Sequence, residues 1–273
     1  DLSRSLREEE EEHPPLATAV PALDRLLDGG LPRGHLVEMV GGRSSGRFSA
    51  LLAALAATTS VGEAAALVDL GDGLDPGTAE TLGADLARLL WVRPTTLQEA
   101  VAAAEMLLGA GFPLVAVDLG NPPVRGGRGV EAVWLRLARA ARHHRGALLV
   151  SSPYRATGTA AAEVLSMSRR RGIWLGSGAA PRLLAGVDSR LEREKSRRQP
   201  GAATGSLQLR APGVVTKEGP PPEIAPAKPS RRRAAKAPDA TTKPDATKSD
   251  ATKSGTSAPS APPPPPARPP ALA

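Results

Sequence analysis

One glycine-rich segment, residues 41–49, has the spacing of a phosphate-binding loop. In the pattern G-x-x-x-x-G-K-[ST], glycines let backbone N–H groups surround phosphates, the lysine contacts the outer phosphates and the hydroxyl binds Mg²⁺. The segment keeps both glycines, but arginine replaces the lysine and phenylalanine replaces the hydroxyl. Altered chemistry on an intact frame indicates a nucleotide-binding fold with impaired catalysis. The candidate nucleotide-binding residues are Gly41, Gly42, Ser44, Ser45, Gly46, Arg47, Phe48 and Ser49, with Asp75 further along the chain.

Arg47 and Asp118 each have two interpretations. A guanidinium either binds phosphate as a permanently charged fork or pairs with a carboxylate such as that of Asp118. Asp118 ends an apolar run, where a buried acid needs a partner or a metal. It is therefore either a Mg²⁺ ligand, with the hydroxyl of Ser49 nearby, or one half of a structural ion pair. The sequence leaves both alternatives open.

The segments that must position these residues alternate between apolar runs and amphipathic periods. Apolar runs predict four strands, over residues 35–40, 64–70, 114–119 and 147–152. Helical spacing predicts helices over residues 48–59, 77–90, 97–109 and 130–145. This alternation predicts an α/β fold with a mainly parallel sheet flanked by helices. Further along, we expect a helix over 159–168, a strand over 172–175, and closing antiparallel strands over 183–191 and 205–209.

Two local features refine these expectations. Thr95 or Thr96, followed by Glu99, predicts a capping box at the start of the helix over 97–109. The three tryptophans are interpreted as anchors of the hydrophobic core, because large aromatic side chains are more often buried than used as ligand platforms. They are Trp91, Trp134 and Trp174.

Composition divides the 273 residues into three parts. The composition predicts an acidic flexible extension over residues 1–15 and a folded core over residues 16–211. Residues 212–273 form a basic tail rich in Pro, Ala and Lys, which we expect to be disordered because it lacks aromatic residues and has few large aliphatic ones. No segment has the roughly 20 uncharged apolar residues of a membrane-spanning helix. We therefore expect a cytoplasmic protein without membrane contact, with association with the nucleoid as an alternative.

The net charge of +7 and the sequence pI of about 10.3 favour contact with polyanions, nucleic acid above all. The alternative is a coding bias toward arginine and alanine. The absence of cysteine excludes a disulfide framework and a thiolate metal site. Aromatic residues make up 2% of the chain, so base stacking is not expected as the main mode of binding.

Three ordered segments resemble the RecA superfamily of ATPases. Residues 23–38 are similar to the entry segment that leads into the phosphate loop, residues 67–76 to the second strand and the turn that packs on adenine, and residues 114–118 to the Walker B strand. The resemblance covers roughly residues 16–210 and implies a RecA-like core. In that family the position of Gly71 carries the glutamate that orients the attacking water. Residues 151–153 stand where a glutamine senses the γ-phosphate.

These departures imply little or no ATPase activity, with weak ATP binding and a Mg²⁺ site as what remains of the family's cofactors. Phosphoryl transfer depends on positioning and charge stabilisation, so the loss of several such groups costs several decades in rate. The alternative is a RecA/KaiC-type, ATP-dependent DNA-binding protein in which Arg47 and Ser49 replace the usual phosphate and metal ligands.

Within the superfamily, residues 89–94 and 193–201 are most similar to the ImuA group of short RecA-like accessory proteins. This resemblance implies a non-catalytic or weakly catalytic adaptor in the SOS response to DNA damage and in translesion DNA synthesis. The implied partners are RecA and an error-prone polymerase subunit. The oligomeric state stays open.

Clustered arginines are candidate contacts to DNA or to a protein partner. In RecA proteins the loop before the helix over 130–145 faces the axis where DNA lies, so residues 121–129 are its counterpart. Arginine gives salt-sensitive affinity for phosphates; the alternative is an ordinary solvated face. A third hypothesis is a DNA-coating protein that acts through its basic tail. The candidate contacts are Arg125, Arg128, Arg136, Arg139, Arg169, Arg170 and Arg171.

Overall fold

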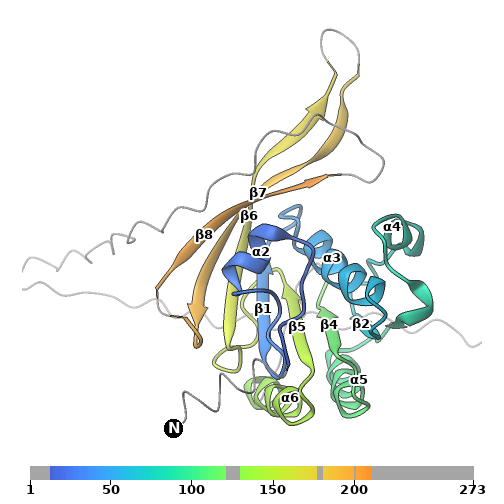
Figure 1. Cartoon of the computed structure of the whole chain (residues 1–273), viewed down its shortest axis with the longest axis vertical. Coiled ribbons are helices and arrows are strands. Elements are labelled where there is room, and N and C mark those ends of the chain that lie inside the picture. Colours follow the sequence, from blue (N-terminus) through green and yellow to red (C-terminus); the bar gives the residue numbers. More distant parts are fainter. Residues whose placement is uncertain (1–12, 121–129, 177–180, 200, 211–273) are drawn as a thin grey trace, which may run out of the picture. The chain divides into compact units, whose positions relative to one another are not determined.

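In the part of the chain that the structure describes, eight strands form one sheet in the order β3-β2-β4-β5-β1-β6-β7-β8 (Figure 1). The computed structural model describes residues 13–120, 130–176, 181–199 and 201–210, all of which fall within one compact unit of the chain. The strands are β1 (Leu36–Gly41), β2 (Ala65–Asp69), β3 (Leu89–Val92), β4 (Leu114–Asp118), β5 (Ala147–Ser152), β6 (Glu163–Leu175), β7 (Leu183–Ser196) and β8 (Ala203–Arg210).

Every ladder from β3 to β6 is parallel, and only the ladders from β6 to β7 and from β7 to β8 are antiparallel. The predicted α/β fold with a mainly parallel sheet is confirmed, and so are the two closing antiparallel strands. The helices in the described part of the chain are α2 (Pro21–Leu26), α3 (Arg47–Ser60), α4 (Pro76–Thr81), α5 (Leu97–Gly109) and α6 (Val130–His144), with a 3₁₀ helix at Leu86–Arg88.

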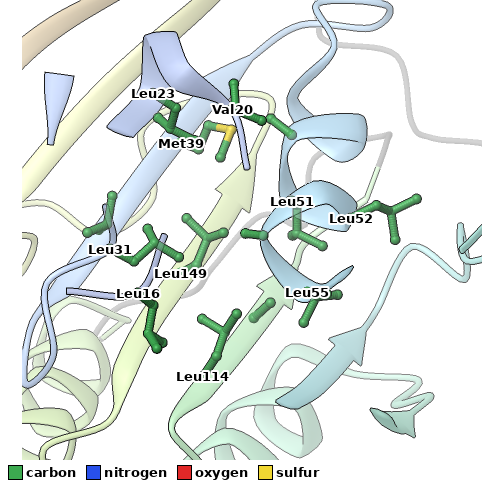
Figure 2. Close-up of a cluster of buried hydrophobic side chains, with 14 of the residues drawn as sticks. Leu16, Val20, Leu23, Leu31, Met39, Leu51, Leu52, Leu55, Leu114 and Leu149 are labelled. Atoms are coloured by element: carbon green, nitrogen blue, oxygen red, sulfur yellow. The ribbon is translucent and has the colours of Figure 1, made fainter. Parts of the chain in front are cut away.

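The sheet separates two hydrophobic layers, because successive side chains of a strand point to opposite faces. In β4, Leu114 and Ala116 join a cluster with α2, α3 and α4. Val115 and Val117 join a second cluster with α5 and α6. Figure 2 shows the first cluster, where leucines of α3 face Leu114 and Leu149 of the sheet. The central strands are therefore buried on both faces, which holds their carboxyl ends in fixed positions.

Local signals start the helices near the sheet's carboxyl edge. Thr96 caps α5 by accepting a hydrogen bond from the N–H of Glu99 at 3.2 Å. The carboxylate of Glu99 accepts in turn from the N–H of Thr95 at 2.8 Å. The predicted cap at Thr96 is confirmed, although the carboxylate of Glu99 bonds to Thr95, one residue before the cap. The hydrogen bonds from Thr95 lower the pKa of Glu99.

The predicted helix over 77–90 is wrong beyond Thr81. Gly83 has φ +93°, a left-handed conformation that ends a helix, and its N–H donates to the carbonyl of Glu80 at 2.9 Å. The short 3₁₀ helix and strand β3 follow, and β3 pairs in parallel with β2. Tertiary pairing therefore turns a segment of helical spacing into an edge strand.

The predicted helix over 159–168 is also wrong. Three alanines favour a helix there, yet Ala160 lies in a turn, donating its N–H to the carbonyl of Thr157 at 3.0 Å. From Glu163 onward the chain pairs with β1, so the predicted strand over 172–175 is only the end of a long strand β6. Trp174 at that end is 55% exposed, so its interpretation as a core anchor is wrong.

Several predictions fall outside the described residues. They are the basic tail over 212–273, most of the acidic extension, and the loop over 121–129 with Arg125 and Arg128. None of the helices in the part of the chain that the structure describes has the length and apolar character that a membrane crossing requires.

Candidate functional site

The phosphate-loop segment connects the end of β1 to the start of α3, as its sequence pattern requires. Gly46 precedes the helix in the left-handed conformation, with φ +88°. A Cβ on Gly41 would lie 2.4 Å from Oγ of Ser45, so only glycine fits at this turn. The Oγ of Ser45 is buried and has no hydrogen-bond partner among the described residues. The loop therefore has the backbone frame of a phosphate-binding loop.

The side chain of Arg47 is buried inside the domain and makes four hydrogen bonds there. Its residue exposure is 4%. Nε donates to the carbonyl of Gly41 at 2.9 Å, and Nη2 donates to the carbonyl of Gly120 at 3.0 Å. Nη1 donates to the Asp118 carboxylate and to the hydroxyl of Ser151, each at 2.5 Å. The guanidinium thus connects the phosphate loop to the ends of β4 and β5.

Asp118 has both carboxylate oxygens occupied by protein donors. Oδ1 accepts from Arg47 and, at 2.7 Å, from the hydroxyl of Ser151. Oδ2 accepts from the N–H of Gly120 at 3.0 Å. The Arg47 and Asp118 side chains are 5% and 4% exposed, so the ion pair is almost fully removed from water. Of the two interpretations drawn from the sequence, the geometry favours the ion pair.

Two glycines bring the turns after β2 and β4 into backbone contact. A Cβ on Gly71 would lie 2.5 Å from Cα of Gly120 and 3.0 Å from Oδ2 of Asp118. Gly120 has φ +70°, and a Cβ there would lie 2.6 Å from Cα of Gly71. No larger side chain fits at either position without movement of the backbone. The position at which the family carries its water-orienting glutamate is therefore closed by main-chain atoms.

Phe48 and the turn after β2 fill the neighbouring space. A Cβ on Gly73 would lie 3.4 Å from Cζ of Phe48, which is ordinary van der Waals contact. The turn is also held from outside, where Arg93 donates two hydrogen bonds to Asp72, each at 2.7 Å. The side-chain hydrogen bond with Arg93 lowers the pKa of Asp72. Phe48 thus acts as packing where a metal-binding hydroxyl is expected.

The antiparallel half of the sheet covers the other side of the loop. The hydroxyl of Ser189 in β7 donates to the carbonyl of Ser45 at 2.7 Å. A Cβ on Gly46 would lie 2.2 Å from Cδ1 of Leu209 in β8, so this leucine rests directly on the loop backbone. The loop is therefore held between β7, β8 and the Arg47 ion pair.

The remaining candidates for nucleotide or metal binding do not join this cluster. Ser49 lies on α3 with an exposed side chain. Asp75 caps α4, accepting from the N–H of Thr78 at 2.9 Å, and hydrogen bonds from Thr78 lower its pKa. Among the described residues, no group of three or more His, Cys, Asp or Glu side chains could hold a metal ion. Ser49 and Asp75 therefore lie apart from the group formed by Arg47, Asp118 and Ser151.

The candidate DNA-binding arginines separate into two places. Arg136 on α6 pairs with Glu105 of α5, with Nη2 and Oε2 3.0 Å apart, and Arg139 is exposed on the same helix. The three consecutive arginines 169–171 were expected before a strand but lie within β6, where all three are exposed. Helix α6 and the long strand β6 therefore present separate basic surfaces.

Sequence reasoning missed two contributors to this region. Gly120 supplies the carbonyl that accepts a hydrogen bond from Arg47, and its main chain contacts that of Gly71. The only sequence signal for this role was a glycine two residues after Asp118. Glu38 lies fully buried in β1 and accepts from the N–H of Thr157 at 3.1 Å and from its hydroxyl at 2.6 Å. An acid inside the apolar run over 35–40 was the available signal, and its role is to hold the segment after β5.

Comparison with known proteins identifies the sequences that this chain resembles. The model of the RecA N-terminal domain family matches residues 6–120. The RecA protein of Amycolatopsis mediterranei is 32% identical over 231 residues, which are 78% of this chain and 64% of that protein. The RecA protein of Mycolicibacterium gilvum is 34% identical over 181 residues, which are 62% of this chain and 50% of that protein. The chain thus spans less than two thirds of the length of these relatives.

The fold is shared with a more distant solved structure. The crystal structure of the RadB recombinase superimposes with a TM-score of 0.55 at 20% sequence identity, covering 72% of this chain and 97% of RadB. At that identity the likeness concerns the fold alone. The family match, the RecA relatives and the fold together show that the chain belongs to the RecA superfamily.

Proposed function

We propose that this chain is a non-catalytic RecA-like adaptor in the DNA damage response and in translesion DNA synthesis, which binds RecA, an error-prone polymerase subunit or both. The observation that carries the proposal is the closed nucleotide site. Arg47 and Asp118 neutralise each other inside the domain, and both carboxylate oxygens are already hydrogen-bonded. The fold is kept, but the Arg47–Asp118 ion pair occupies the place where a nucleotide and its metal would bind. Binding to partner proteins is then the activity that the fold can still provide.

The chemistry of phosphoryl transfer supports this reading. Catalysis of that reaction consists almost entirely of positioning and of charge stabilisation around the transferred phosphoryl group. Here the charged group of the loop is turned inward to Asp118, and Phe48 packs at the position of the metal ligand. At Gly71 a carboxylate side chain has no room, because Gly120 occupies the space. We therefore expect neither water activation nor Mg²⁺-dependent affinity for ATP.

The context of DNA repair is supported by the names of the relatives, which are RecA proteins and a RadB recombinase. The ImuA-like segment over residues 89–94 begins with the edge strand β3 and continues to Arg93, which holds the turn after β2. The adaptor role itself, and the choice of RecA and a polymerase subunit as partners, rest on that resemblance combined with the closed site.

Two measurements test the proposal. Phosphate release should stay at background with ATP, Mg²⁺ and single-stranded DNA, and isothermal titration should give the same weak or absent ATP binding with and without Mg²⁺. A purified, tagged chain should retain purified RecA or the polymerase subunit in a pull-down. Mg²⁺-dependent turnover by the purified wild type would instead establish an ATPase with unusual ligands. Retention of neither protein would contradict the adaptor role.

A further inference from the structure

Strand β6 continues past the strand that pairs with it on one side. The β1–β6 ladder ends with Gly41 opposite Met167, whereas β6 runs on to Leu175. Figure 1 shows β6 and β7 extending as a ribbon beyond the ends of the parallel strands, and β8 pairs with the other side of β7 as far as Gly186. Over residues 168–175, no other described strand pairs with this side of β6. These residues form an open sheet edge, with backbone donors and acceptors available to an added strand.

Three consecutive arginines line this edge because the strand is irregular there. Arg169 lies opposite Ser189 and Arg171 opposite Asp188, so Arg170 is an extra residue in the ladder. A bulge of this kind breaks the alternation of faces and lets all three side chains reach water. Arg171 is 3.2 Å from Asp188, while Arg169 and Arg170 form no ion pair with a described carboxylate. The edge therefore carries uncompensated positive charge.

An apolar patch adjoins the arginines near the end of the ribbon. Trp174 and Leu184 face each other across the ladder and are 55% and 46% exposed. The indole lies over Gly172, where a Cβ would be 2.8 Å from Nε1 of Trp174. Trp174 and Leu184 belong to neither hydrophobic cluster of the core. Trp134, in contrast, has no exposed surface.

These observations point to a protein ligand with a definite chemistry. Exposed charge alone protects a sheet edge from unwanted pairing, but an exposed tryptophan beside a leucine does not serve that purpose. Tryptophan and arginine are the residue types most enriched among those that dominate protein interfaces. Leu184 offers no stacking surface to a nucleic-acid base, whereas it suits an apolar side chain. The combination therefore favours a peptide segment over a nucleic acid.

We propose that residues 168–175 of β6 bind an extended, acidic protein segment that carries apolar side chains at alternate positions. Backbone hydrogen bonds would add it to the sheet as an extra strand. Its carboxylates would pair with Arg169 and Arg170, and one apolar side chain would pack on Trp174 and Leu184. This deepens the proposed adaptor role by naming the chemistry of a partner, and it is independent of the nucleotide site.

The test uses the full chain and a fluorescein-labelled peptide in which glutamate alternates with valine. Fluorescence anisotropy should show saturable binding to the wild type. Trp174→Ala and the double variant Arg169→Glu/Arg170→Glu should each weaken binding about tenfold or more. Arg25→Glu, an exposed arginine on α2, is the matched control and should leave binding unchanged. Circular dichroism establishes that each variant is folded.

Two further probes separate strand addition from simple charge attraction. The same peptide with alternate backbone nitrogens methylated should lose most of its affinity, because it can no longer donate to the sheet edge. Equal binding of the methylated peptide, or no saturable binding of the parent peptide, overturns the proposal. So does a single-stranded or duplex DNA oligonucleotide that binds more tightly than the peptide and is lost in the same variants. A failed pull-down of RecA or polymerase would leave this direct measurement unaffected.

Discussion

The phosphate-loop end and the ribbon of β6 and β7 use arginine in opposite ways. Arg47 is 4% exposed and makes four hydrogen bonds inside the domain. Arg169 and Arg170 are exposed on an open strand edge and have no described carboxylate partner. A guanidinium that makes four hydrogen bonds to its own protein and is almost fully buried stabilises the fold and is not exposed to a partner. If the proposed function is correct, binding takes place where the same group remains solvated, as Arg169 and Arg170 do on the ribbon.

The contrast between a structural Arg47 and the solvated arginines of the ribbon is wrong if Arg47 contributes little to stability. Arg47→Ala leaves the buried carboxylate of Asp118 without its charged partner, so we expect a loss of about 3–5 kcal/mol in the free energy of unfolding. Urea denaturation measures it. The double variant Arg47→Met/Asp118→Asn should recover part of the loss, because it leaves no unpaired charge. A loss below about 1 kcal/mol for the single variant would indicate a solvated, ligand-binding arginine.

A second prediction concerns the backbone contact that closes the nucleotide site. Gly71→Ala places a Cβ 2.5 Å from Cα of Gly120, so we expect destabilisation of about 1–3 kcal/mol by overpacking. Gly42→Ala in the phosphate loop is the control, since a Cβ there meets no atom within 4 Å. Thermal denaturation of both variants compares them. Equal stability of the two would mean that the turns after β2 and β4 separate readily.

A third prediction concerns the root of the ribbon, where β6 still pairs with β1. Burial raises the pKa of Glu163, and a hydrogen bond from Ser196 only partly offsets this. The ionised form is therefore disfavoured in the fold, and wild-type stability declines as pH rises through the raised pKa. Glu163→Gln removes that cost while keeping an acceptor for Ser196. Its stability relative to wild type should increase from about pH 4 to about pH 8.

The matched control for this pH dependence is Glu194→Gln, an exposed glutamate that pairs with Arg155. Urea denaturation at each pH gives the free energy of unfolding of both variants. A pH-independent difference between Glu163→Gln and wild type would contradict the assigned direction of the pKa shift.

The smallest expected effect sharpens the contrast between core and ribbon. Trp174→Ala should change the free energy of unfolding by no more than about 0.5 kcal/mol, because the side chain is half exposed and outside the core. Trp134→Ala removes a fully buried side chain and should lower the free energy of unfolding by about 3–5 kcal/mol. Calorimetry of the two variants tests the pair. A large loss for Trp174→Ala would mean that the ribbon is part of the core, and it would weaken the docking proposal.

Much of the parallel core and the two closing antiparallel strands were predictable from the sequence, whereas the first part of β6 was not. Strands such as Leu114–Asp118 are fully apolar and buried on both faces, so pattern alone identifies them. The segment from Thr159 onward carries three alanines and reads as a helix, because its pairing with β1 depends on residues more than a hundred positions away. Trp174 was misassigned because hydrophobicity does not reveal whether a strand continues beyond its sheet.

The candidate site was foreseen only as a set of alternatives. The exchange of lysine for Arg47 was visible in the sequence, and so was Asp118 as its acidic counterpart. The direction of the guanidinium depends on Ser151 in β5 and on the carbonyl of Gly120 just after β4. Asp75 stood at the expected turn, but its bond to Thr78 is a local cap. Contacts between residues far apart in the sequence, and not residue types, decide whether Arg47 and Asp118 form an ion pair or face a ligand.

The contact between the main chains at Gly71 and Gly120 also limits which side chains these two positions accept. Restoring a glutamate at position 71 would force two turns apart before any benefit to hydrolysis could appear, because its Cβ would meet Cα of Gly120 at 2.5 Å. A carboxylate at this position would therefore require movement of one of the two turns as well as the substitution itself.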